Sequence, residues 1–275
     1  AQVSGSSFAQ NVNGEDGGTT TGSGVYAKGA TDVNGTFLGD ATSDITIGES
    51  GNITGLGIVG SLGSDGLLAS QFAVTSTTTE GTSYADGDVN ASGIRGTDAG
   101  ANASAGENQT LLTAGPTDGD IIGQTITGMS ATSNSIDDAA DSDMNADIHG
   151  LLEVDMLGGQ TGVNLIKGTT SGDFDSTAVT VGGNATADGV VSGYGIYDAD
   201  GDGFITTSGN VQAISNLLNT VTASSTSGSA TATAETTAVG LGNYSVTILG
   251  SGTMTSTAVG VTDSTASSVA GRAFS

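Results

Sequence analysis

Small apolar and polar residues alternate along much of this chain, with the period of two that is typical of a β-strand. The strictest alternation covers residues 229–236, which read SATATAET, and shorter examples occupy residues 72–75, 178–181 and 244–248. Clusters of Gly, Asp, Asn and Ser separate these segments and favour turns. The pattern therefore predicts an all-β fold built from many short strands.

Two segments are also compatible with a helix. In residues 209–220, Val211, Ile214, Leu217 and Leu218 fall at helical spacing, although a buried strand explains them equally well. Residues 136–152 form a second, more acidic candidate. Because Gly and β-branched residues recur throughout, we expect at most one or two short helices.

The composition predicts thin layers instead of a thick core. The chain has 47 Gly, no Trp, no Cys and only 4% aromatic residues, so few large side chains can fill an interior. An elongated sandwich or an irregular β-solenoid fits this composition, and no fixed repeat length is visible that would favour a strict solenoid. The single proline, Pro116, suggests an N-terminal β region over residues 1–115 and a C-terminal one over 116–275, unless the two form one continuous domain.

The charge excludes several kinds of partner. The formal net charge is −25, and the four basic residues are scattered singly. Nucleic acids and anionic membranes need clustered Lys and Arg, so neither is an expected partner. No apolar run is long enough for a transmembrane helix. Ala1 suits the cleavage site of a secretion signal, which predicts an extracellular location at the cell surface.

The sharpest chemical motif is Asp198-x-Asp200-x-Asp202-Gly-Phe204. Three carboxylates at alternate positions of a Gly-bearing turn converge on a cation, and the Phe204 carbonyl can add a fourth ligand. These ten or so residues resemble the first half of the calcium loops in EF-hand and dockerin domains. They depart from that pattern at the twelfth position, where Gly209 replaces a bidentate acid. The motif predicts bound Ca²⁺, with a solvated acidic turn as the alternative.

Two further acidic alternations are weaker candidates for cation binding. Asp141, Asp143, Asn145 and Asp147 occupy every second position, so an extended strand would place them on one face, whereas a loop could wrap them around a cation. Asp86, Asp88 and Asn90 form a similar set. Plain surface is the alternative for both.

Seven Asn-x-Ser/Thr sequons are possible glycosylation sites on exposed turns, although a chain this rich in Ser and Thr contains several by chance. They begin at Asn34, Asn52, Asn90, Asn102, Asn108, Asn184 and Asn243.

Catalysis finds little support in the sequence. The chain has one histidine, His149, and no cysteine, so a zinc site or a Ser-His-Asp arrangement would depend on that residue alone. His149 lies beside Asp147 without a nucleophile-elbow pattern, and we expect it to be a turn or surface residue. The sequence therefore predicts a protein that is not an enzyme.

The chain resembles secreted proteins that form extracellular filaments and sheaths of archaea and bacteria. The features that carry the resemblance are the dominance of Gly, Ser, Thr and Ala, the scarcity of Lys, Pro, Trp and Cys, the sequons, and the alternating segment at 229–236. It looks most like the sheath proteins of filamentous methanogenic archaea, and next like pilus or thread subunits joined by donated strands. The resemblance implies a homopolymer of β-strand subunits.

Strand edges give an independent reason to expect self-assembly. Natural monomers guard exposed edges with Lys or Pro, and this chain has almost none of either. We therefore expect a structural subunit of an extracellular polymer, joined by β-strand pairing between subunits. The alternative is a calcium-dependent surface adhesin or carbohydrate-binding module.

Overall fold

The computed structural model of this 275-residue chain describes most of its C-terminal half and a set of strands in its N-terminal half. The described residues are 2–5, 8–13, 18–21, 27–28, 41–47, 53–56, 64–78, 82–95, 111–113, 121–153, 155–157 and 165–275. Side chains are described for residues 82, 83, 85, 87, 122–153, 155, 156 and 165–275.

Within these residues every regular element is a β-strand, as expected for an all-β fold, and all strand pairs are parallel. Sheet A contains β1 (Gln2–Gly5), β2 (Phe8–Asn13), β5 (Ala41–Ile47), β7 (Ser64–Thr78), β10 (Ile121–Ser135), β13 (Leu165–Thr180), β16 (Asn210–Ser225) and β19 (Met254–Ser268). Sheet B contains β3 (Gly18–Thr21), β4 (Ala27–Lys28), β6 (Ile53–Leu56), β8 (Ser83–Arg95), β11 (Ala140–Leu152), β14 (Ala185–Tyr197), β17 (Ala230–Gly242) and β20 (Ala273–Phe274). Sheet C contains β9 (Leu111–Thr113), β12 (Asp155–Leu157), β15 (Phe204–Thr207) and β18 (Ser245–Ile248).

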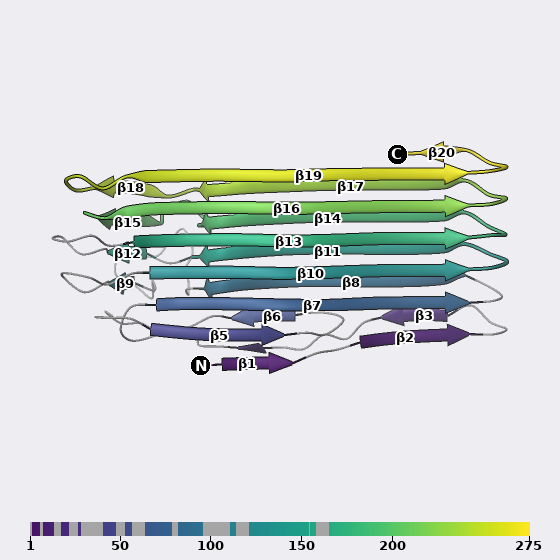
Figure 1. Ribbon diagram of the computed structural model, residues 1–275, viewed down its shortest axis with the longest axis horizontal. Coiled ribbons are helices and arrows are strands. Elements are labelled where there is room, and N and C mark those ends of the chain that lie inside the picture. Colours follow the sequence, from purple (N-terminus) through teal and green to yellow (C-terminus); the bar gives the residue numbers. More distant parts are fainter. Residues whose placement is uncertain are drawn as a thin grey trace.

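The chain winds through the three sheets in order, which makes the fold a β-solenoid. From β10 to β18, each coil runs along a long strand of sheet A, reverses in a tight turn, returns along sheet B and then enters a short strand of sheet C (Figure 1). Strands of successive coils lie directly above one another, and the C-terminal coil forms one end of the stack (Figure 1). Sheet A thereby pairs β7 with β10 across the segment that holds Pro116, and the division of the chain at that proline stays a prediction.

The coils have a regular length that the sequence analysis did not find. Ile121 pairs with Ile166 and Ile166 with Val211, which is 45 residues in each case, and Val211 then pairs with Met254 after 43. The earlier step from Ser64 to Ile121 is longer, at 57 residues, and the step from Ala41 to Ser64 is shorter, at 23. The expectation that no fixed repeat exists is therefore wrong for these coils. The regularity is hidden because the length of the connections varies within each coil.

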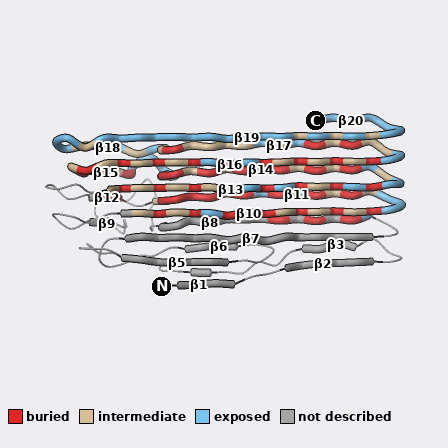
Figure 2. The backbone as a smooth tube through the Cα atoms, viewed as in Figure 1, coloured by how far each residue is buried: buried red, intermediate tan, exposed pale blue. Residues whose placement is uncertain are grey.

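Alternation of buried and more exposed positions follows β10, β13, β14 and β16 and defines the core. In β16, Val211, Ala213, Ser215 and Leu217 point inward, whereas the residues between them lie on the outer face of sheet A (Figure 2). One core cluster, near the turns, consists almost entirely of alanine, and this lets the two sheets approach closely. A second cluster of Leu, Ile, Met and Val fills the wider space beside sheet C.

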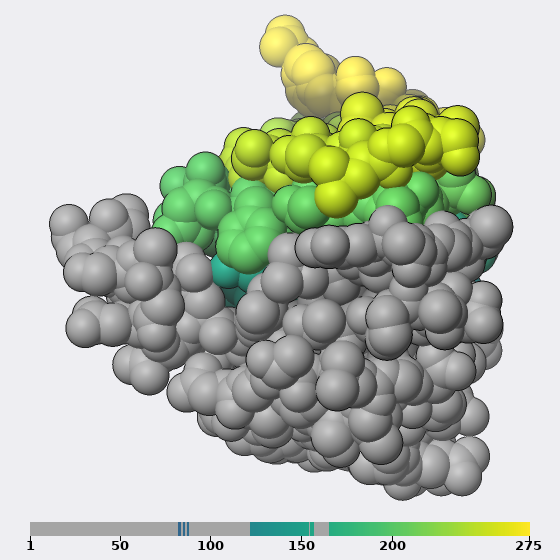
Figure 3. Space-filling model, turned by 90° about the vertical axis from the view of Figure 1, so that its left-hand side faces the viewer, coloured from purple at the N-terminus to yellow at the C-terminus, as the bar shows by residue number. Residues whose placement is uncertain are grey.

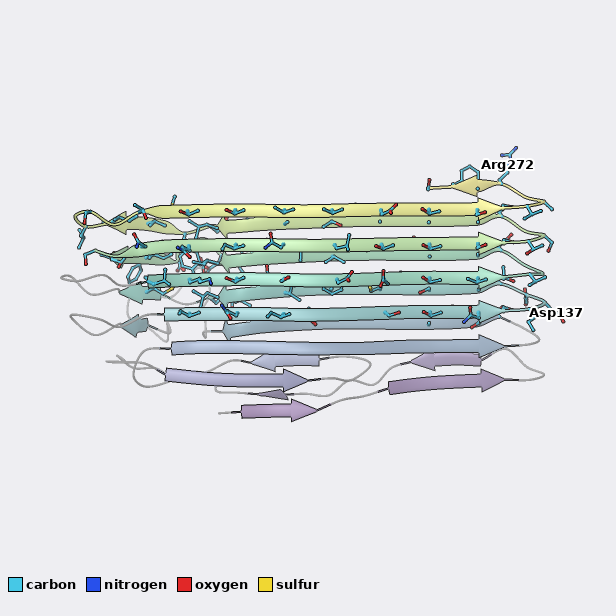
Figure 4. The ribbon with its side chains drawn as sticks, viewed as in Figure 1. Asp137 and Arg272 are labelled. Carbon is cyan, nitrogen blue, oxygen red and sulfur yellow. The ribbon has the colours of Figure 1, made fainter. Side chains whose placement is uncertain are left out.

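Hydroxyl side chains fasten each coil to the one below at the turns. The Ser225 hydroxyl accepts a hydrogen bond from the Gly228 N–H at 2.8 Å and donates one to the Gly183 carbonyl of the preceding coil at 2.6 Å. Thr180 and Ser268 make the same pair of hydrogen bonds in their own coils. The turns therefore stack one above another as a ladder along one side of the solenoid, where Asp137 and Arg272 lie several coils apart (Figure 4).

Both helical candidates of the sequence are strands in the structure. Residues 210–225 form β16 and residues 140–152 form β11. Ile214 and Leu218 lie on the outer face of sheet A, opposite to Val211 and Leu217, so the apolar residues divide between two faces of a strand instead of sharing one helical face. β16 has a parallel neighbour on each side, and these strands form hydrogen bonds with its backbone N–H and C=O groups. The helical spacing of its apolar residues does not outweigh this pairing.

Candidate functional site

The three carboxylates of the predicted calcium motif lie together at one corner of the solenoid. Asp198, Asp200 and Asp202 each offer one oxygen atom, and these atoms lie within 4.8 Å of one another. Asp198 is only 3% exposed, whereas Asp200 and Asp202 face solvent. A divalent cation between these oxygens would be held by hard anionic ligands of the kind that calcium prefers.

This corner is enlarged relative to the same corner in the neighbouring coils. Two residues separate Leu152 from Asp155 and two separate Gly242 from Ser245, but six separate the equivalent Tyr197 from Phe204. The short corners begin with Glu153 and Asn243 in the left-handed conformation, at φ of 53° and 59°. This corner is thus four residues longer than its neighbours, and all three acids lie among its six residues, 198–203.

Hydrogen bonds hold the inserted loop in shape. One carboxylate oxygen of Asp198, Oδ2, accepts hydrogen bonds from the N–H groups of Gly201 and Gly203, both at 2.8 Å. Gly201 has a φ of 86°, which a side chain would disfavour. Phe204 follows as the first residue of β15, and its N–H donates to Asp155 Oδ1 at 3.1 Å. The role of the Phe204 carbonyl as a metal ligand stays a prediction.

The two weaker acidic sets come from adjacent strands of sheet B and lie in register. Asp143 pairs with Asp86, Asn145 with Asp88 and Asp147 with Asn90, as partners in β11 and β8. The residues of β11 do occupy one face of an extended strand, and no loop wraps them around a cation. The parallel register thus places the acidic or amide residues of one coil beside those of the next.

The next coil adds another carboxylate to this acidic face. Asp188 of β14 is the register partner of Asp143. Burial raises the pKa of Asp141, and the carboxylates of Asp188 and Asp143 raise it further. On the outer face of sheet A, burial and the charge of Asp173 likewise raise the pKa of Asp175, against a hydrogen bond from Thr220 that lowers it. Sheet A and sheet B therefore each carry a carboxyl group, Asp175 and Asp141 respectively, whose pKa is raised because its charged form is disfavoured.

His149 lies in a strand and is almost covered, so the expectation of a turn or surface position is wrong. It is 4% exposed within β11, and its ring stacks on Tyr194 with ring centroids 5.1 Å apart. Tyr197 stacks on both of these rings. Asp147 lies 3.6 Å from the imidazole Nε2. Sequence reasoning missed this aromatic stack, because parallel register, and not local spacing, brings residues 149 and 194 together.

Two of the seven sequons begin at residues whose side chains are described, and both lie in exposed turns. Asn184 follows β13 and uses its Oδ1 to accept a hydrogen bond from the Ser229 N–H at 2.9 Å. Asn243 forms an exposed corner before β18. Asn90 is placed only as a residue of β8, and Asn34, Asn52, Asn102 and Asn108 lie outside the described residues.

The C-terminal end of the stack exposes a long strand edge. β19 pairs with β16 on one side and ends sheet A in the described chain. Beside it, β20 covers only Ala230 and Thr231 of the thirteen-residue strand β17. Viewed from the side of sheet C, this last coil forms the top of the molecule (Figure 3). Its backbone groups are therefore available for pairing with a further strand.

Comparisons with known proteins give no relative for this chain: no family model, no curated protein and no solved structure matches it. In the part of the chain that the structure describes, no helix is long and apolar enough to cross a membrane.

Proposed function

We propose that this chain is a non-catalytic structural subunit of a microbial extracellular polymer, such as a filament, pilus or sheath, whose copies join by β-strand pairing. The open edge of β19 is the observation that carries this proposal. Fifteen residues of extended backbone end sheet A there, and Asp263 is the only charged residue among them. Lys or Pro residues, which keep strand edges apart in monomeric proteins, do not occur in β19.

The construction of the solenoid also favours a structural role. Parallel coils with matching positions form a rod whose core is continuous from coil to coil, so an added strand at its end extends both the hydrogen bonding and the core. The one histidine is almost covered and stacks on a pair of tyrosines, so little of its ring is accessible to a substrate. The cell-surface location rests on the resemblance to sheath proteins.

Electron microscopy and sedimentation velocity of the purified chain over a range of concentrations test the proposal. We expect assemblies that grow with concentration, and fibre diffraction from them with a strand spacing of about 4.7 Å. A chain that remains monomeric at high concentration, with and without calcium, would contradict the proposal.

We further propose that Asp198, Asp200 and Asp202, with the Phe204 carbonyl, hold a Ca²⁺ ion that stabilises the enlarged corner. The convergence of the three carboxylates in this enlarged six-residue corner supports this site. It also supports the second candidate function, a calcium-dependent adhesin, in which the loaded corner would contact a ligand on another surface.

Thermal unfolding in calcium and in chelator tests the ion. We expect calcium to raise the Tm of the wild-type chain and to leave the double variant Asp200→Asn, Asp202→Asn unchanged. Asp137→Asn, at an exposed turn distant from this corner (Figure 4), is the matched control and should respond like the wild type. Equal Tm values for the wild type in calcium and in chelator would contradict the proposed ion. Loss of assembly in chelator, but not in calcium, would favour a contact between molecules that depends on calcium.

Glycans on Asn184 and Asn243 are part of the same proposal, because both residues are exposed on turns. Mass spectrometry of peptides from the native material checks them. Unmodified Asn184 and Asn243 in that material would exclude these two sites.

A further inference from the structure

The charge of the chain is distributed very unevenly along the solenoid. Residues 221–275 contain two acids, Glu235 and Asp263, and one base, Arg272, for a net charge of −1. The other 220 residues hold the remaining 27 of 29 acids and three of four bases, for a net charge of −24. The C-terminal coils are thus the one nearly neutral part of a strongly anionic chain, and Arg272 is exposed at their end (Figure 4).

The same coils concentrate exposed apolar side chains. Twelve large apolar side chains are exposed in the described part of the chain, and five of them lie in residues 254–274, namely Met254, Val259, Val261, Val269 and Phe274. Val259 and Val261 are 47% and 49% exposed on the outer face of β19, and Val261 is the register partner of Leu218, which is also exposed. The open backbone edge is therefore bordered by apolar surface.

From these observations we infer that the occupant of the β19 edge is the β19 edge of a second copy, so that two chains meet tail to tail across a two-fold axis. This inference rests on the proposed self-assembly and specifies its first contact. A head-to-tail stack would instead bring the neutral end against the N-terminal residues 1–63, which hold six acids and one base. Tail-to-tail contact places the nearly neutral ends together and keeps the two anionic bodies apart.

The geometry of the end suits a two-fold contact. A two-fold axis normal to the sheets brings β19 against its symmetry mate in antiparallel orientation, and the inward-facing and outward-facing positions then continue across the junction. Because β19 spans residues 254–268, complete overlap places the axis at Val261, the central residue. Val261 then lies opposite itself, and Val259 lies opposite Asp263.

Single cysteines test this arrangement cleanly, since the chain has no cysteine of its own. Antiparallel partners have Cα atoms about 4.5–5.5 Å apart, within the range that a disulfide bridges. We expect Val261→Cys to give a disulfide-linked dimer on mild oxidation, and an equimolar mixture of Val259→Cys and Asp263→Cys to give a mixed one. Val190→Cys, at an outward position of β14 with 42% exposure, is the control and should stay unlinked.

A charge exchange gives a second measurement that does not depend on disulfide chemistry. Val261→Asp and Val261→Lys should each form smaller assemblies than the wild type in sedimentation velocity, because like charges would face each other across the axis, whereas their mixture should recover the wild-type size. Val190→Asp should associate like the wild type, and circular dichroism should show the same strand content in all variants. Only a contact between two identical edges predicts recovery in the mixture.

The outcomes separate this inference from the proposed function. Assembly without crosslinking at residues 259–263, and without recovery in the mixture, would overturn the tail-to-tail contact and leave the structural polymer in place with a different junction. Absence of any association would overturn both. Recovery in the mixture together with the Val261→Cys crosslink is the result expected.

Discussion

Asp143 of β11 and Asp188 of β14 are register partners in adjacent coils, so that two carboxylates occupy neighbouring positions on one face of sheet B. Together with burial they raise the pKa of Asp141 above its reference value of 3.8. A carboxyl group whose pKa is raised by folding binds more protons in the folded state than in the unfolded state. Stability therefore falls as the pH rises from 3.8 through the pKa of the folded state.

The first prediction follows from this sign. Lowering the pH from 7 through the folded-state pKa of Asp141 towards 3.8 should raise the Tm of the chain, and Asp141→Asn should raise the Tm at pH 7 and weaken its pH dependence. Differential scanning calorimetry at several pH values measures both effects, with Asp137→Asn in an exposed turn as the control. A Tm that falls on mild acidification would show that the stacked carboxylates do not govern stability.

The second prediction concerns the close stacking of the turns. A Cβ atom on Gly228 would lie 2.1 Å from the carbonyl oxygen of Gly183 in the preceding coil, and backbone cannot yield as a flexible side chain would. Gly228→Ala should destabilise the fold by about 2 kcal/mol or more, in urea unfolding followed by circular dichroism. Gly260→Ala is the control, since its nearest neighbour is the Thr236 methyl group at 3.2 Å. Equal stability of the two variants would contradict this account of the turns.

The third prediction concerns the hydroxyl ladder. Ser225→Ala removes a donor to Gly183 and an acceptor for Gly228, both at a buried position. Because the two backbone groups lose their partners, we expect a cost of about 1–3 kcal/mol in the free energy of unfolding. The neighbouring Ser224 lies on the outer face of β16, and Ser224→Ala should change the same measurement by less than about 0.5 kcal/mol. A larger effect at Ser224 than at Ser225 would be inconsistent with the ladder.

The fourth prediction uses the length of the coil. Deletion of residues 166–210 joins Leu165 to Val211, which is the register partner of Ile166, and so removes one coil with all its connections. The shortened chain should keep its strand content by circular dichroism and unfold cooperatively. Deletion of residues 166–205 leaves part of a coil behind and should yield a chain that aggregates or unfolds. Similar behaviour of the two deletions would argue against the 45-residue coil as the structural unit.

Local patterning was sufficient to predict the strands and the faces of many residues. The alternation in residues 229–236 became β17, and the alternating acids of residues 141–147 share one face of β11. Turn chemistry likewise placed Asn184 and Asn243 at exposed positions. These features depend on side chains two residues apart, which a reader of the sequence can compare directly.

The repeat could not be recognised in the same way, because equivalent residues differ and the connections vary. The coil that begins at Leu165 has six residues in its corner between sheets B and C where its predecessor has two. It then has three residues between Thr206 and Asn210 where its predecessor has seven between the equivalent Leu157 and Leu165. The two changes cancel, so both coils contain 45 residues. Between the two changes, however, structurally equivalent residues are not 45 positions apart in the sequence. The contact of His149 with Tyr194 was missed for the same reason, since it depends on that register.

The equal 45-residue length of two successive coils has a genetic consequence. A DNA segment of 135 nucleotides encodes each 45-residue coil, and its ends fall at the same point of the rod, so unequal recombination between coils adds or removes whole units in frame. Such events can therefore change the length of the rod by one coil at a time while the strands on either side of the exchange keep their register.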